Sequence, residues 1–210
     1  MYPKPLTILA KIGTMATVAG PRGPVPVAHW PMRNLILVAF TEPVVEGTDF
    51  PREDWPLHIT LVRFDVDSNG GAEGGDASGA VQTVDLPDLI AGLIDEPVRE
   101  ALGARLTVGA DAGFGRYGSI PVNLVEPSQP LQALHEALMR TVTDLGGRVP
   151  SPHHTMEGFR PHVSHHGEKR LHPGTEVVLD RVALVDMAPD GNHAVRRILR
   201  LWKFNDAGDA

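Results

Sequence analysis

The segment WPLHITLVRF, residues 55–64, is an apolar run interrupted by one imidazole and one hydroxyl group. Apolar and β-branched residues in such a run predict a β-strand. Side chains two positions apart in a strand point to the same face, so His58 and Thr60 are expected to lie together. A histidine in this setting is either a structural residue of the core or part of a site. A second copy of the pattern would favour the site.

That second copy is present in FRPHVSHH, residues 159–166, where His162 is followed by Ser164. If the two strands lie side by side, two imidazoles and two hydroxyls converge on one small volume. An imidazole with a pKa near 6.5 can accept or donate a proton near neutral pH. Hydroxyls can donate hydrogen bonds to the non-bridging oxygens of a phosphate. The four groups therefore predict in-line attack on a phosphodiester without a metal ion.

The rest of the chain favours an α+β fold with mostly antiparallel strands. Apolar, β-branched runs and turn residues predict the strands, whereas an apolar stripe of period 3.6 predicts the helices. The predicted strands are 33–43, 55–66, 105–114, 119–127, 159–166, 175–189 and 193–204, and the predicted helices are 86–104 and 128–146. Pro97 is expected to break or restart the first helix. Strands and helices do not alternate regularly, which argues against a parallel sheet.

Composition excludes several classes of protein. The chain has 210 residues, a formal net charge of -7 and no cysteine. Disulfides, zinc–thiolate sites and thiol nucleophiles are therefore excluded. The negative charge argues against binding along a duplex nucleic acid, although a local basic patch could still bind a small anion. No apolar run approaches the roughly 20 residues of a membrane span. Since Lys11 interrupts the apolar stretch 5–20, we expect no signal peptide and a cytoplasmic protein. We also expect a monomer.

Two further motifs resemble ligand sites, but the residues around them do not fit a ligand. Gly113, Gly115 and Gly118 form a G-x-G-x-x-G pattern, yet an extended segment follows it where a dinucleotide site needs a helix. We therefore expect a hairpin turn. The segment 65–76 matches much of a calcium-binding loop, but Asp76 stands where the bidentate glutamate belongs and no helix precedes it.

A histidine cluster near the second motif suggests a metal site, because imidazole is a common metal ligand. Its members are His153, His154, His162, His165 and His166. Few carboxylates lie nearby in the sequence, so His153 and His154 are expected to be solvated or hydrogen-bonded loop histidines. We expect no metal and no cofactor.

The sequences HIT, 58–60, and HVS, 162–164, in their order among the predicted elements, resemble the two-histidine (2H) phosphoesterase superfamily, which includes the 2′-5′ RNA ligase and cyclic phosphodiesterase group. The resemblance covers roughly residues 33–204. It implies two similar lobes, with flanking helices, around a central cleft to which each lobe supplies one motif. It also implies that His58 and His162 are catalytic, and that Thr60 and Ser164 bind the substrate phosphate.

Other residues depart from the family pattern or could assist. His166 lies on the predicted face of His162 and could reach the cleft, and Arg160 and Arg63 could supply positive charge. The pair His165–His166 stands where an apolar residue is more usual. Two segments look like additions to the family domain, namely the N-terminal extension 1–32, which is expected to pack on the fold, and the glycine-rich loop 67–80. Residues 205–210 are expected to form a C-terminal tail.

The expected function is metal-independent hydrolysis of 2′,3′-cyclic phosphate or 2′-5′ phosphodiester bonds in RNA ends or nucleotides. One histidine would deprotonate water and the other would protonate the leaving ribose oxygen, in roles that the sequence does not assign. Degradation of cyclic or 2′-5′ oligonucleotide signals is an alternative. A nucleotide- or RNA-binding module without turnover is another.

Overall fold

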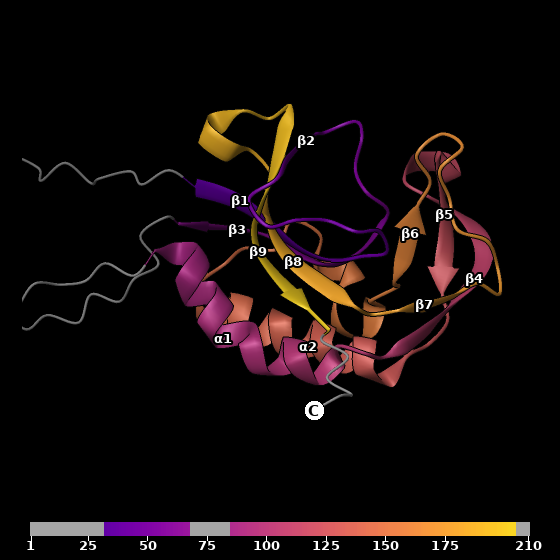
Figure 1. The fold of residues 1–210 in the computed structure, drawn as a ribbon, viewed down its shortest axis with the longest axis horizontal. Coiled ribbons are helices and arrows are strands. Elements are labelled where there is room, and N and C mark those ends of the chain that lie inside the picture. Colours follow the sequence, from indigo (N-terminus) through magenta and orange to yellow (C-terminus); the bar gives the residue numbers. More distant parts are fainter. Residues whose placement is uncertain (1–31, 68–84, 205–210) are drawn as a thin grey trace, which may run out of the picture.

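A computed structural model describes residues 32–67 and 85–204 (Figure 1). The predictions for the N-terminal extension, the glycine-rich loop, most of the calcium-like segment and the C-terminal tail lie outside the described residues. In chain order the elements are β1 (Met32–Phe40), β2 (Asp49–Pro51), β3 (His58–Asp67), α1 (Leu86–Ala101), β4 (Arg105–Phe114), β5 (Ile120–Val125), α2 (Gln129–Asp144), β6 (His162–Ser164), β7 (Glu176–Val178), β8 (Arg181–Asp186) and β9 (Val195–Lys203).

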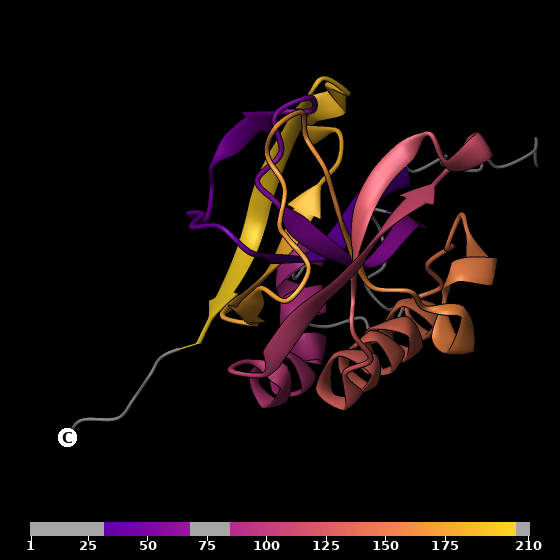
Figure 2. The same cartoon turned by 90° about the vertical axis from the view of Figure 1, so that its right-hand side faces the viewer.

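The strands form one antiparallel sheet in the order β2-β9-β8-β1-β3-β6-β5-β4-β7. Helices α1 and α2 pack side by side on one face of this curled sheet, as Figures 1 and 2 show from two directions. The predicted α+β class and the antiparallel pairing are confirmed. The predicted division into two lobes around a cleft is not confirmed, because β3 and β6 pair with each other and one sheet runs through all nine strands. In the described part of the chain, no helix is long and apolar enough to span a membrane.

The two helices supply most of the core on their side of the sheet. The stripe predicted for α2 is buried at Leu131, Leu134, Leu138 and Val142. The prediction that Pro97 breaks the first helix is wrong, since α1 continues through it. A proline in a helix removes one backbone hydrogen bond. The burial of the apolar residues Ile90, Ile94 and Val98 against the sheet outweighs that loss.

A β-bulge in β3 determines which side chains reach the opposite face. Leu37 of β1 pairs with Val62, but the next residue, Val38, pairs with Thr60, so Leu61 is an extra residue without a partner in β1. A bulge of this kind reverses the alternation of side chains beyond it. Both Leu61 and Val62 consequently lie in the core beneath the helices.

The reversal brings charged residues onto the face that carries the first motif. Simple alternation along an unbroken strand would place Arg63 opposite to His58 and Thr60. Because of the bulge, Arg63 and Asp65 line the same hollow as His58 and Thr60.

The glycine pattern forms the hairpin turn between β4 and β5, as predicted. Gly115 and Gly118 have φ angles of 73° and 70°, which glycine adopts without steric cost. Gly113 is required for a different reason, because a Cβ atom there would lie 2.8 Å from the carbonyl oxygen of Gly118. The turn therefore depends on close contact between two backbone segments.

Replacing Gly113 by alanine should destabilise the protein by about 1–3 kcal/mol, since the added methyl group meets backbone that cannot move cheaply. Gly92 provides the matched control. It lies in the interior of α1, and a Cβ there meets nothing within 4 Å. Gly92→Ala should stabilise the protein by about 1 kcal/mol, through helix propensity. Urea unfolding of both variants is the measurement, and equal stability of the two would contradict this account of the turn.

Candidate active site

The two histidine motifs lie on adjacent strands. Ile59 of β3 pairs with Val163 of β6 in an antiparallel register. The same register places His58 beside Ser164, and Thr60 beside His162. Ile59 and Val163 are buried in the core, so the flanking polar residues share the opposite face.

In this arrangement the two histidines are diagonal neighbours. Diagonal neighbours in an antiparallel pair are about 7–8 Å apart, and their Cβ atoms are somewhat closer. A small group such as a phosphate can therefore contact both imidazoles and both hydroxyls. The structure thus brings together all four residues that the motifs singled out.

The motif face contains two adjoining hollows. One, of about 660 Å³, is lined by His58, Thr60 and Ser164, among other residues. The other, of about 240 Å³, is lined by Thr60 and His162 together with apolar side chains. Thr60 and Arg63 line both hollows. The first hollow is the more polar, and the second offers an apolar surface of the kind that a ribose or a nucleobase can cover.

His58 is held in one orientation. Its Nδ1 lies 2.8 Å from the carbonyl oxygen of Pro56, and its ring lies 4.4 Å from the Trp55 ring, centroid to centroid. A carbonyl oxygen only accepts hydrogen bonds, so Nδ1 carries the proton and donates. The unprotonated Nε2 is then free for a substrate.

His162 repeats this arrangement. Its Nδ1 donates to the carbonyl oxygen of Arg160 at 2.8 Å, and its ring lies 4.3 Å from the ring of Phe114. Each histidine therefore donates to the carbonyl two residues before it and packs closely against an aromatic ring, and His58 also meets the edge of the Phe40 ring. The two halves of the site are related by an approximate local twofold about the Ile59–Val163 pair.

Burial keeps both imidazoles neutral at pH 7. It lowers the pKa of His58 to about 4, although the hydrogen bond to Pro56 raises it, and the nearby His166 and His162 lower it further. Burial also lowers the pKa of His162, again opposed by the hydrogen bond to the carbonyl of Arg160. The charges of Arg160 and His154 add to the lowering. A bound phosphate would act in the opposite direction, because a nearby negative charge favours the protonated form.

The three predicted accessory residues all border the site. His166 lines the larger hollow with His58 and Ser164, and Arg63 lines both hollows. Arg160 lines the smaller hollow, and its guanidinium lies 5.1 Å from the centroid of the Phe114 ring.

The unusual His165 has a structural role on the other side of β6. Its Nε2 lies 2.7 Å from the side-chain oxygen of Asn123, which is fully buried. The Asn123 amide donates in turn to Asp111 at 2.6 Å. A buried amide needs such partners, and the histidine that replaces the usual apolar residue supplies one of them.

His135, which no sequence pattern indicated, contacts both the bulge in β3 and a residue that lines the smaller hollow. Its Nδ1 donates to the carbonyl oxygen of the bulge residue Leu61, and its Nε2 accepts from the backbone N–H of Met156, both at 2.8 Å. Its ring stacks on Phe159, which lines the smaller hollow. His135 lies on the apolar face of α2, and no local signal distinguishes it from an ordinary core position.

Three further residues of the larger hollow were also missed. Arg52 follows β2, His193 precedes β9, and Arg196 belongs to β9. His193 and Arg196 lie far from both motifs in the sequence, and Arg52 precedes the first motif without belonging to its strand. The pairing of β9 with β8 and with β2 brings all three to the site.

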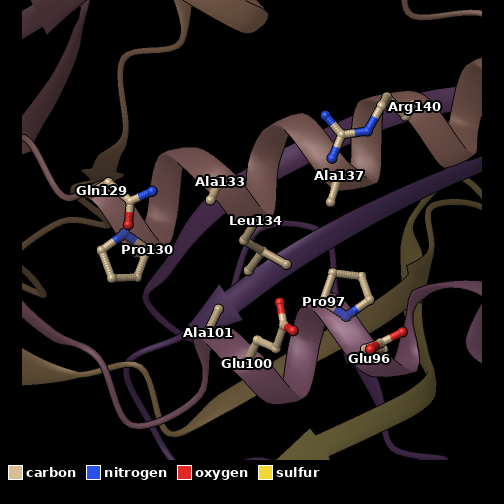
Figure 3. Close-up of a pocket in the computed structure, with 10 residues that line it drawn as sticks. All are labelled: Glu96, Pro97, Glu100, Ala101, Gln129, Pro130, Ala133, Leu134, Ala137 and Arg140. Atoms are coloured by element: carbon tan, nitrogen blue, oxygen red, sulfur yellow. The ribbon is translucent and has the colours of Figure 1, made fainter.

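Another hollow, of about 540 Å³, lies between α1 and α2 (Figure 3). Glu96, Glu100 and Arg140 line it together with alanine, proline and leucine side chains. It contains no motif residue and belongs to the helix layer, so it is separate from the candidate site. Among the described residues, no group of three or more histidine, aspartate or glutamate side chains is arranged to hold a metal ion.

Comparisons with known structures gave matches at low sequence identity. E. coli LigT complexed with 3′-AMP is 15% identical with a TM-score of 0.48, and covers 84% of this chain and 100% of its own. E. coli LigT complexed with NADP+ is 13% identical with a TM-score of 0.44, and covers 83% of this chain and 98% of its own. A crystal structure of a phosphoesterase is 13% identical with a TM-score of 0.43, and the match covers 84% of this chain and 100% of the phosphoesterase chain. A comparison with curated protein sequences gave no match.

The sequence profile of the 2′-5′ RNA ligase superfamily matches residues 38–190. The match spans more than half of the chain and includes both histidine motifs. It agrees with the family that the two motifs indicated. This chain belongs to the 2′-5′ RNA ligase superfamily of 2H phosphoesterases.

Proposed function

We propose that the protein is a metal-independent phosphodiesterase that hydrolyses 2′,3′-cyclic phosphate or 2′-5′ phosphodiester bonds in nucleotides or RNA ends. The observation that carries the proposal is the Ile59–Val163 register, which sets two imidazoles and two hydroxyls around one position. Both imidazoles keep Nε2 available for a substrate, since each Nδ1 is held by a carbonyl oxygen. This is the equipment for moving two protons in one displacement at phosphorus.

In the proposed reaction, one Nε2 accepts a proton from water as the water oxygen bonds to phosphorus. The bond from phosphorus to the ribose oxygen breaks, and that oxygen takes a proton from the other histidine. The product is a phosphomonoester, and proton exchange with solvent restores the two imidazoles. Thr60 and Ser164 donate hydrogen bonds to the non-bridging oxygens as charge develops on them.

We assign the base to His58 and the acid to His162. A base must be neutral when the substrate binds, and burial keeps His58 neutral down to a pH of about 4. His162 lies beside the apolar hollow, where the ribose of a nucleotide can be placed with its leaving oxygen towards the imidazole. The negative charge of the bound phosphodiester favours protonation of this histidine.

The roles can be separated by changing the leaving group. On a 2′,3′-cyclic nucleotide, His58→Ala and His162→Ala should each lower kcat by about 10²–10⁴-fold, the usual effect of losing a general acid or base. A nucleoside 5′-(4-nitrophenyl) phosphodiester releases nitrophenolate, which needs no proton. On that ester His162→Ala should retain most of its activity, whereas His58→Ala should remain impaired.

His153→Ala is the control, because His153 is exposed and does not line either hollow. It should behave as the wild type on both substrates. The opposite ranking of the two variants on the nitrophenyl ester would reverse the roles, and full activity of both on the cyclic nucleotide would refute the proposal.

The pH dependence of kcat/KM should be bell-shaped, with its optimum below pH 6.5. The acidic limb reports His58, which must be neutral, and the alkaline limb reports His162, which must be protonated. Both pKa values are lowered in the free protein, so both limbs move towards acid. The kcat profile should lie at higher pH, since the bound phosphate raises both pKa values.

The measurement is the rate on a 2′,3′-cyclic nucleotide across pH, with and without a chelator. Activity should survive the chelator, because imidazoles and hydroxyls supply both the protons and the phosphate contacts. An enzyme that the chelator inactivates and one divalent cation restores would show that a metal site is needed instead.

A further inference from the structure

The larger hollow has a strongly basic wall in an acidic protein. Arg52, Arg63 and Arg196 line it, and they come from three separate segments of the chain. The one carboxylate among its lining residues is Asp65, which accepts a hydrogen bond from Asn34. The formal net charge of the whole chain is -7, so this concentration of arginine is local. General surface composition does not account for it.

Arg196 is buried and fixed in place, with 6% of its surface exposed. Its Nη1 donates to three backbone carbonyl oxygens, those of Met187, His193 and Val195. Within the part of the chain that the structure describes, Nε is fully buried without any hydrogen-bond partner. Nη2 donates to none of these residues either, and it is not among the fully buried atoms. A buried polar group without a partner is rare in proteins, so the position of this side chain calls for an explanation.

Other protein charges do not neutralise this guanidinium. Burial lowers the pKa of Arg196, and the positive charges of Arg52 and Arg63 lower it further. Asp186 acts in the opposite direction, but it already forms an ion pair with Arg33 at 2.6 Å. Neither Arg52 nor Arg63 forms an ion pair with any residue in 32–67 or 85–204. An anion in the hollow would relieve this like-charge repulsion.

Arg196 and His58 are separated by one aromatic ring. The guanidinium carbon of Arg196 lies 5.8 Å from the centroid of the Trp55 ring, and that ring lies 4.4 Å from the ring of His58. Arg63 lines both hollows with Thr60, so it belongs with the phosphodiester that is cleaved. Arg52 and Arg196 line the larger hollow alone, beyond His58.

We infer that Arg52 and Arg196 form a second anion subsite, which binds a phosphate that the substrate carries in addition to the phosphodiester that is cleaved. The inference rests on the proposed function for the position of the cleaved group. A phosphomonoester carries about −1.5 to −2 charges near neutral pH and offers three acceptor oxygens, which suits two guanidinium groups. The substrate class is therefore a nucleotide with a further terminal phosphate.

The test compares adenosine 2′,3′-cyclic phosphate with its 5′-phosphorylated counterpart. The wild-type kcat/KM should favour the 5′-phosphorylated substrate by about tenfold or more, the effect of one or two charge-assisted hydrogen bonds. Arg52→Gln should remove most of that preference. Arg140→Gln is the control, since Arg140 lies in the helix layer, away from the motif face, and should keep the full preference.

Arg196 is buried, so Arg196→Lys is assayed only after its circular dichroism matches the wild type. The lysine keeps the charge but lacks the planar fork of guanidinium donors, and the preference should again fall. Equal kcat/KM for the two substrates in the wild type would overturn the subsite, and so would a preference that Arg52→Gln leaves intact.

A binding measurement separates this inference from the proposed function. Calorimetric titrations compare adenosine 3′,5′-bisphosphate with adenosine 3′-monophosphate, and neither requires turnover. Tighter binding of the bisphosphate that Arg52→Gln weakens would uphold the subsite, even if no cyclic nucleotide were hydrolysed. Equal binding of the two nucleotides would overturn it, even in an active phosphodiesterase.

Discussion

The pairing of Ile59 with Val163 is the contact on which the rest of the site depends. It joins two groups of strands into one sheet, and both side chains are buried in the core beneath the helices. A slip of one residue would turn every side chain of one strand to the opposite face. His162 and Ser164 would then enter the core, where their polar groups would lack partners. The same burial that stabilises the fold therefore sets the chemistry of the opposite face.

Backbone features on either side of this pairing refine the site. The bulge at Leu61 turns Arg63 towards the histidines, and His135 satisfies the carbonyl oxygen that the bulge leaves unpaired in the sheet. Carbonyl oxygens in turn fix the tautomers of His58 and His162. These bonds are made by the protein before any substrate arrives, so the free nitrogens are already oriented. The basic wall beyond His58 extends this preorganised surface to a second charged group.

The features of this structure that depend on neighbouring residues in the sequence could be predicted, whereas those that depend on strand pairing and packing could not. Alternation and β-branched residues predicted the strands, the apolar stripe predicted α2, and the repeated H-x-[T/S] pattern identified four residues that the fold brings together. The position of Arg63 could not be derived, because a bulge depends on the pairing with β1 and leaves no local mark. Arg196 could not be linked to His58, since only the order of the strands β9, β8, β1 and β3 places them in one hollow. The continuation of α1 through Pro97 depends on packing against the sheet, which propensity does not include.

The central claim is that two strands supply one catalytic unit, and a double-mutant cycle on a 2′,3′-cyclic nucleotide tests it most directly. Rates would be measured for the wild type, His58→Ala, His162→Ala and the double variant. Groups that act together in one step give non-additive losses. The account predicts that the double variant is little slower than the slower single variant. Losses that multiply, or a single variant with the wild-type rate, would contradict it.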